Sequence, residues 1–174
     1  MSTMPSAISM YHASVPVFRQ MLLSLSDVLG KAQAYGEAKK IEQPVLLQSR
    51  LSLDMFPLVR QVQIACDFAQ SVTARLAAVE VPAYDDSEQD IAGLQARITR
   101  TVAFLDGLNE AKFDGSEALE IVLRPGTPKE KTLIGRTYLL NYGLPQFFFH
   151  VTTAYNLLRH NGVEIGKKDF MGKY

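Results

Sequence analysis

The chain has 174 residues, 47% hydrophobic and 21% charged, which is the composition of an ordinary soluble globular protein. Its formal net charge is zero at pH 7, which argues against a nucleic-acid-binding module and against electrostatic attachment to an anionic membrane. We therefore expect a single domain over residues 1–174, with no nucleic-acid partner and no membrane partner.

Three further features concern cellular location. The apolar runs are shorter than the roughly 20 residues that span a bilayer. Residues 1–10 show no basic region followed by an apolar core, so no signal peptide is expected. The only cysteine, Cys66, lies inside an apolar helical pattern and cannot form an internal disulfide. Together these features predict a cytoplasmic protein with a buried, unreactive thiol.

The first predicted helix follows apolar residues that recur at steps of three and four from Tyr11 to Ala32 and ends near Tyr35. Pro16 falls inside this pattern, and it should either bend the helix or mark its first turn. Either outcome places Tyr11 and His12 near the open N-terminal end of the helix.

The second helix has the clearest register in the chain, from Met55 to Val79. Asp54 is a plausible cap, and Pro57 is tolerable in a first turn. Asp54 and Gln61 flank the apolar seam at a separation of seven residues, so they share one face of the helix. They form either a solvated rim or part of a cavity lining.

The third helix runs from Ile91 to Leu108, and residues 87–90 before it resemble a capping box with Asp90 in place of the usual Glu or Gln. Arg97 flanks the apolar seam of this helix. We expect it to form an ion pair with a carboxylate across the bundle, whereas Asp67 on the second helix should point elsewhere.

A β-hairpin is predicted between the third and last helices. Residues 119–123 alternate in polarity, a Pro/Gly turn follows at residues 125–128, and an apolar run resumes at residues 132–134. An isolated hairpin is only marginally stable in water, so it should pack on the helices.

The last helix, Leu144 to Gly162, has the most legible ends. Pro145 suits a first turn, and Asn161 followed by Gly162 is typical of a left-handed stop. Apolar residues line two of its sides, which predicts a central helix surrounded by the others. His150 is the only titratable residue on its second apolar stripe.

His150 has three interpretations: a hydrogen-bonded core residue, a pocket residue that binds a small ligand or acts as a general base, or a single metal ligand. His160 lies about 15 Å further along the helix and roughly 80° around it, so the two histidines cannot share a metal. One turn after His150 come Thr153 and Ala154, which are not strong metal ligands. No phosphate-binding loop, HExxH or CxxC motif is present.

These elements predict an all-α, up-and-down four-helix bundle with a small β-hairpin insertion before the last helix. Two sets of residues also resemble the motifs of a bacterial family known only as a domain of unknown function. The sets are Asp54–Leu58 with Gln61–Gln63 and Ala65–Asp67, and Leu144–Pro145 with Phe149–Tyr155, Leu158–Arg159, Gly162 and Gly166–Phe170. The resemblance covers nearly the whole chain and includes Tyr11, Ser14–Pro16 and Arg97.

That family is similar to the DinB/YfiT-like metalloenzyme superfamily, which implies a four-helix bundle that is often dimeric and often metal-dependent. The superfamily site has three histidines, one on the second helix and two spaced by four on the last. Here the second helix has no histidine, and Ala154 stands where a partner of His150 would fall. We therefore predict no metal and no other cofactor, although the resemblance allows a divalent metal.

Two functional hypotheses follow. The first is a small-molecule site, catalytic or not, at one end of the bundle. Its candidate residues are His150, Gln61, Asp54, Tyr11, His12 and Thr153. The alternative is a non-catalytic homodimeric binding or stress-accessory protein that has lost the superfamily metal site. A homodimer is expected in either case, from the resemblance and from the apolar surface of four helices.

Overall fold

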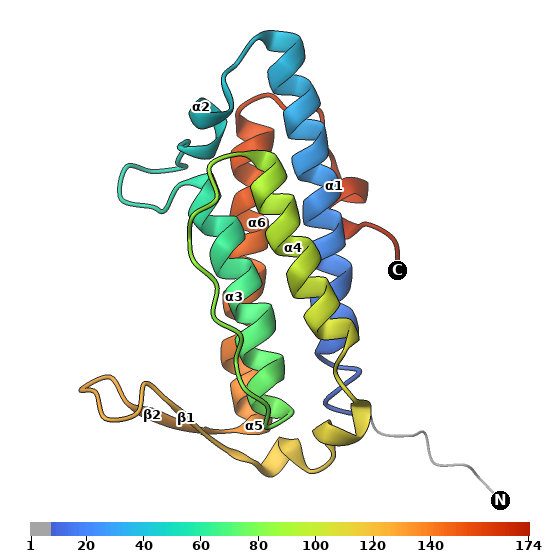
Figure 1. The fold of residues 1–174 in the computed structure, drawn as a ribbon, viewed down its shortest axis with the longest axis vertical. Coiled ribbons are helices and arrows are strands. Elements are labelled where there is room, and N and C mark those ends of the chain that lie inside the picture. Colours follow the sequence, from blue (N-terminus) through green and yellow to red (C-terminus); the bar gives the residue numbers. More distant parts are fainter. Residues whose placement is uncertain (1–7) are drawn as a thin grey trace, which may run out of the picture.

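The computed structural model describes residues 8–174. Most of residues 1–10, for which no signal peptide is expected, therefore lies outside the described part. The described part is mostly helical and contains one small hairpin. Four long helices lie side by side (Figure 1). They are α1 (Val15–Lys39), α3 (Leu58–Leu76), α4 (Ile91–Asp106) and α6 (Leu144–His160).

Shorter elements connect these helices, and one more, α7, follows the last of them. The predicted hairpin is confirmed, with Glu120 of the first strand opposite Ile134 of the second. The shorter elements are α2 (Gln43–Leu47), the 3₁₀ turns η1 (Glu110–Phe113) and η2 (Ser116–Ala118), β1 (Glu120–Leu123), β2 (Lys131–Ile134), α5 (Gly135–Thr137), the π-helical η3 (Tyr138–Gly143) and α7 (Lys167–Met171).

The apolar stripes of the four long helices meet in one core. Phe18 of α1 and Phe147 of α6 are both fully buried and pack edge to face, with ring centroids 4.7 Å apart. Burial of such large side chains is the main source of stability for a bundle. The side chain of His150 is also buried, at 7% exposure, as its place on the second apolar stripe predicts.

Local signals set the ends of α1 and α6. Because α1 begins at Val15, Pro16 lies in its first turn, and Tyr11 and His12 precede the helix in a separate turn. At the other end of the chain, Gly162 adopts φ = +95° and ends α6 in the left-handed conformation that glycine tolerates best.

Two predicted caps are wrong. Helix α3 begins at Leu58 with Pro57 at its N-cap, and Asp54 instead accepts a hydrogen bond from Ser52 at 2.8 Å. There is no capping box before α4, because Asp90 is itself the N-cap and accepts from the backbone N–H of Gly93 at 2.7 Å.

The strictly alternating helix order is also wrong at one connection. Helices α3 and α4 run in the same direction, and an extended segment returns along the bundle between them (Figure 1). We call this segment, residues 77–90, the strap. Parallel neighbours need such a return crossing, whereas antiparallel neighbours are joined by short loops.

Within residues 8–174, the structure contains no helix with the length and apolar character needed to cross a lipid bilayer.

Candidate functional site

His150 projects from α6 onto α3, where it meets Gln61. The ring Nδ1 lies 2.7 Å from Gln61 Oε1, and Gln61 Nε2 donates to the backbone oxygen of Phe56 at 3.0 Å. A carbonyl oxygen only accepts, so the amide NH₂ of Gln61 must face Phe56 and its oxygen must face the imidazole. Nδ1 therefore carries the proton, and the lone pair lies on Nε2.

Aromatic rings enclose the imidazole on two sides. Phe68 stacks on it with centroids 5.9 Å apart and planes at 16°, and Phe149 meets it edge-on at 5.2 Å. Burial, assisted by the nearby positive charge of Arg60, lowers the pKa of His150 to about 4. The imidazole is therefore neutral at physiological pH, with Nε2 as an acceptor.

A surface hollow of about 250 Å³ lies next to Phe149, whose ring packs against the imidazole, and His150 is not itself part of its lining. Its lining residues are Asn141, Tyr142, Pro145, Gln146 and Phe149, from η3 and the first turns of α6. Gln146 lies one helical turn before His150, on the same side of α6. Tyr142 contacts Phe68, whose ring stacks on His150, so the aromatic wall of the hollow is continuous with that of the histidine.

The hollow depends on an irregular turn in the helix. Residues 138–143 form a π-helix, a conformation that often accompanies functional sites. A Cβ on Gly143 would approach Val72 Cγ2 of α3 to 2.7 Å, so glycine is needed for α3 and α6 to approach this closely.

The remaining predicted site residues do not join His150 and Gln61. Asp54 lies in the loop before α3, and Thr153 donates to the backbone oxygen of Phe149 at 2.7 Å. Tyr11 packs against Phe113, and His12 lies 3.2 Å from Glu110. These last two residues directly precede α1, whereas Gln61 lies near the start of α3.

Sequence reasoning missed a second polar cluster, which is centred on Arg97. Its guanidinium is 1% exposed and contacts Asp67 at 2.6 Å, so the predicted ion pair is confirmed but Asp67 does not point away. Asp86 and Glu88, both on the strap, contact Arg97 at 3.1 Å. Only the returning course of the strap brings them there, and no periodicity in the sequence signals that course.

Charge pairing in this cluster overcomes burial. Burial opposes ionisation of Glu88, yet hydrogen bonds from Gln63 and Arg97 lower the pKa of this carboxyl. Burial likewise opposes the charge of Arg97, but Asp67 and Glu88 raise the pKa of its guanidinium. Both groups are therefore held in their charged forms.

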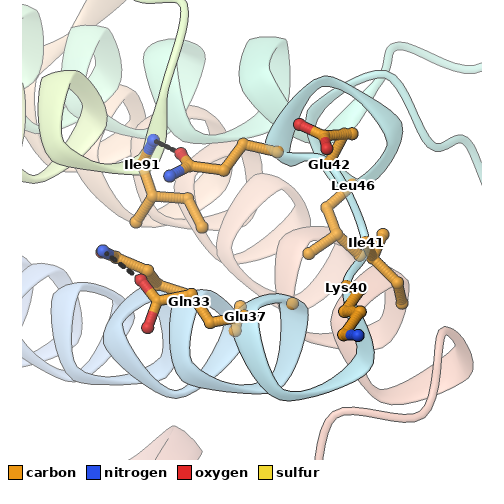
Figure 2. A pocket seen from close by; sticks show the side chains of 10 residues that line it. Gln33, Glu37, Lys40, Ile41, Glu42, Leu46 and Ile91 are labelled. Carbon is orange, nitrogen blue, oxygen red and sulfur yellow. Dashed lines mark hydrogen bonds between the residues drawn. The ribbon is translucent and has the colours of Figure 1, made fainter.

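Another hollow, of about 480 Å³, lies between the end of α1, α2 and the start of α4 (Figure 2). Gln33 donates to Glu37 at 3.0 Å, and the side-chain oxygen of Gln43 accepts from the backbone N–H of Ile91 at 2.8 Å. The first contact links two successive turns of α1, and the second holds α2 against α4, so we assign the hollow a structural role.

The residues around His150 do not fit the three-histidine metal site that the resemblance implies. Gln61 faces the imidazole from α3, and Ala154, one turn further along α6, is fully buried. Across residues 8–174, no three His, Cys, Asp or Glu side chains are grouped so that they could hold a metal ion. We therefore assign no chemical step to a metal.

The fold defines a mostly helical protein of the DinB-like class. A crystal structure of a DinB family member protein from Shewanella denitrificans is similar to this chain, with a TM-score of 0.89 and 43% sequence identity. The similarity covers 94% of this chain and 92% of that one. Residues 10–171 match the family described as Domain of unknown function (DUF1993), and the chain belongs to this family. A search of curated proteins finds no match.

Proposed function

We propose that this DUF1993 protein is a DinB/YfiT-like four-helix bundle that binds a small molecule at His150. The observation that carries the proposal is the 2.7 Å contact between His150 Nδ1 and Gln61 Oε1. This contact fixes the ring orientation and leaves the Nε2 lone pair available. Among residues 8–174, Nε2 forms no hydrogen bond.

The surroundings of the ring favour an apolar or aromatic molecule with one hydrogen-bond donor. Tyr142, Pro145 and Phe149 offer apolar and aromatic surface in the adjacent hollow, whose volume of about 250 Å³ suits a single ring. A lone pair on a neutral imidazole accepts a hydrogen bond from a hydroxyl or N–H group.

The low pKa of His150 favours ligand binding over general-base catalysis. A general base works best when its pKa lies near the working pH. Because the pKa of His150 is lowered to about 4, the imidazole accepts a hydrogen bond readily but is a weak acceptor of a whole proton.

The alternative is a non-catalytic homodimeric binding or stress-accessory protein. It is supported by two exposed apolar side chains next to Gln61 and His150, since Phe56 and Phe149 are both 54% exposed. Sedimentation velocity of the wild type and of a Phe56→Ser, Phe149→Ser variant tests it, because only a dimer formed through this surface would dissociate. We also propose a cytoplasmic location, which a free, buried Cys66 supports.

Phenol and toluene are matched probes for the ligand site, because they share a ring and differ in the donor. In ¹H–¹⁵N spectra, phenol should shift the resonances of residues 141–150 and of Gln61 in a saturable way, and toluene should bind more weakly. In His150→Phe, phenol should lose its advantage over toluene. Equal affinity for the two probes in the wild type, or shifts elsewhere only, would contradict the proposal.

A further inference from the structure

The strap is attached to the bundle almost entirely through side chains. Within the described part of the chain, no backbone N–H group of residues 80–90 donates a hydrogen bond to a backbone oxygen. The ring of Tyr84 packs 4.8 Å from the guanidinium of Arg100 and 6.0 Å from that of Arg97. The backbone oxygen of Asp85 accepts from Arg97 at 3.2 Å. The strap can therefore leave the bundle without breaking a helix.

Two carboxylates of the strap are paired with three arginines of the bundle. Asp86 contacts Arg60 of α3 at 2.5 Å and Arg97 of α4 at 3.1 Å. Glu88 contacts Arg97 at 3.1 Å and Arg100 at 3.7 Å. These carboxylates occupy the arginines as a bound anion would.

The surface beneath the strap is polar, although it is buried. The side chains of Gln63, Gln70 and Arg97 are each no more than 2% exposed. Arg97 Nε and Gln70 Nε2 are fully buried and have no hydrogen-bond partner in the described part of the chain, residues 8–174. Unpaired buried donors are costly, and an apolar seam would be at least as stable, so structural support alone does not explain this stripe.

We infer that Arg60, Arg97 and Arg100 form a binding site for a small dianion, and that Asp86 and Glu88 of the strap block it in this structure. When the strap leaves, these three positive charges face the single negative charge of Asp67. Guanidinium groups bind phosphate and carboxylate through paired hydrogen bonds. The site does not include His150 or Gln61, although the charge of Arg60 also acts on the pKa of His150.

A route from solvent to this site is present. A groove of about 820 Å³ runs beside the strap, and Glu88 and Arg100 are both part of its lining. An incoming anion would first meet the Glu88–Arg100 pair, at 3.7 Å the longest of these contacts. It would then displace Asp86 and Glu88 in turn.

Inorganic phosphate is the probe, and the variant is Asp86→Asn, Glu88→Gln in the full chain. These changes remove the competing charges and leave the arginines in place, so phosphate should bind about tenfold more tightly in calorimetry. Adding Arg97→Lys should abolish the gain. Asp106→Asn is the matched control, since Asp106 pairs with exposed Arg19 away from the strap, and it should bind phosphate like the wild type.

A second measurement follows the strap itself. Phosphate should accelerate chymotrypsin cleavage after Tyr84 in the wild type, more than potassium chloride at equal ionic strength does. Equal phosphate affinity in the wild type and the double variant, or equal acceleration by both salts, would overturn the inference. Should the double variant lose its helical circular dichroism, Glu88→Gln alone carries the same test, because Glu88 contacts two of the three arginines.

Discussion

At the scale of single residues, Gln61 determines how His150 presents its ring. Its amide is held by the backbone oxygen of Phe56, so an oxygen and not an NH₂ group faces the imidazole. Replacing Gln61 with Glu keeps the size and places a carboxylate beside the ring. That charge stabilises the imidazolium, so the pKa of His150 should rise above about 4 in an NMR titration. An unchanged pKa would show that the two side chains do not interact.

Arg97 makes a second residue-scale prediction. Replacing it with Met removes from Glu88, whose side chain is 5% exposed, the closer of its two arginine partners. Removing one member of a buried ion pair typically costs about 3–5 kcal/mol, and we expect a loss of that order in urea unfolding. Arg19→Met is the control, because Arg19 and Asp106 are both about half exposed, and it should cost under about 1 kcal/mol. Equal losses of unfolding free energy in Arg97→Met and Arg19→Met would show that the buried arginine contributes no more than an exposed one.

At the scale of elements, the proline, glycine and alternation signals are confirmed, whereas the cap signals at Asp54 and at residues 87–90 are wrong and the course of the strap has no signal in the sequence. Pro145 and Gly162 mark the two ends of α6, because each residue acts through its own backbone geometry. Alternating polarity predicts the hairpin. The π-helix of η3 was missed, since it depends on the fit of Gly143 against α3. For the site, helical periodicity places His150 on an apolar stripe and Gln61 beside the apolar seam of its helix, but it cannot decide which faces meet.

The fit of η3 against α3 can be measured directly. Gly143→Ala would place a methyl group 2.7 Å from Val72 Cγ2, so we expect a loss of about 1–3 kcal/mol in urea unfolding. Adding Val72→Ala should recover part of the loss by making room. Gly166→Ala is the matched control, because its Cβ would meet open space. A neutral Gly143→Ala would mean that α3 and α6 can move apart without cost.

At the scale of the whole molecule, burial of a neutral histidine links stability to pH. The folded-state pKa of His150, about 4, lies below the ordinary histidine value of 6.5. The unfolded chain therefore binds the proton first, so the contribution of His150 is complete above pH 6.5 and is lost as the pH falls towards 4. The lowered pKa of Glu88 makes its own contribution, which is lost at lower pH still.

Comparison with His150→Phe isolates this effect. Between pH 6.5 and 4 the wild type should lose about 2.5 kcal/mol more of its unfolding free energy than the variant does. His160→Gln, which changes an exposed histidine at the end of α6, should behave like the wild type. Parallel pH profiles for the wild type and His150→Phe would contradict the burial of an uncharged ring.

The protonation state of His150 is the most direct test of the proposed site. With ¹⁵N-labelled histidine, side-chain NMR at pH 7 should show the proton on Nδ1 and a bare Nε2, and the ring should stay neutral down to pH 5. A proton on Nε2 would contradict the account because the acceptor offered to a ligand would then be absent, and titration of this ring near pH 6.5 would contradict it because the imidazole would not be buried.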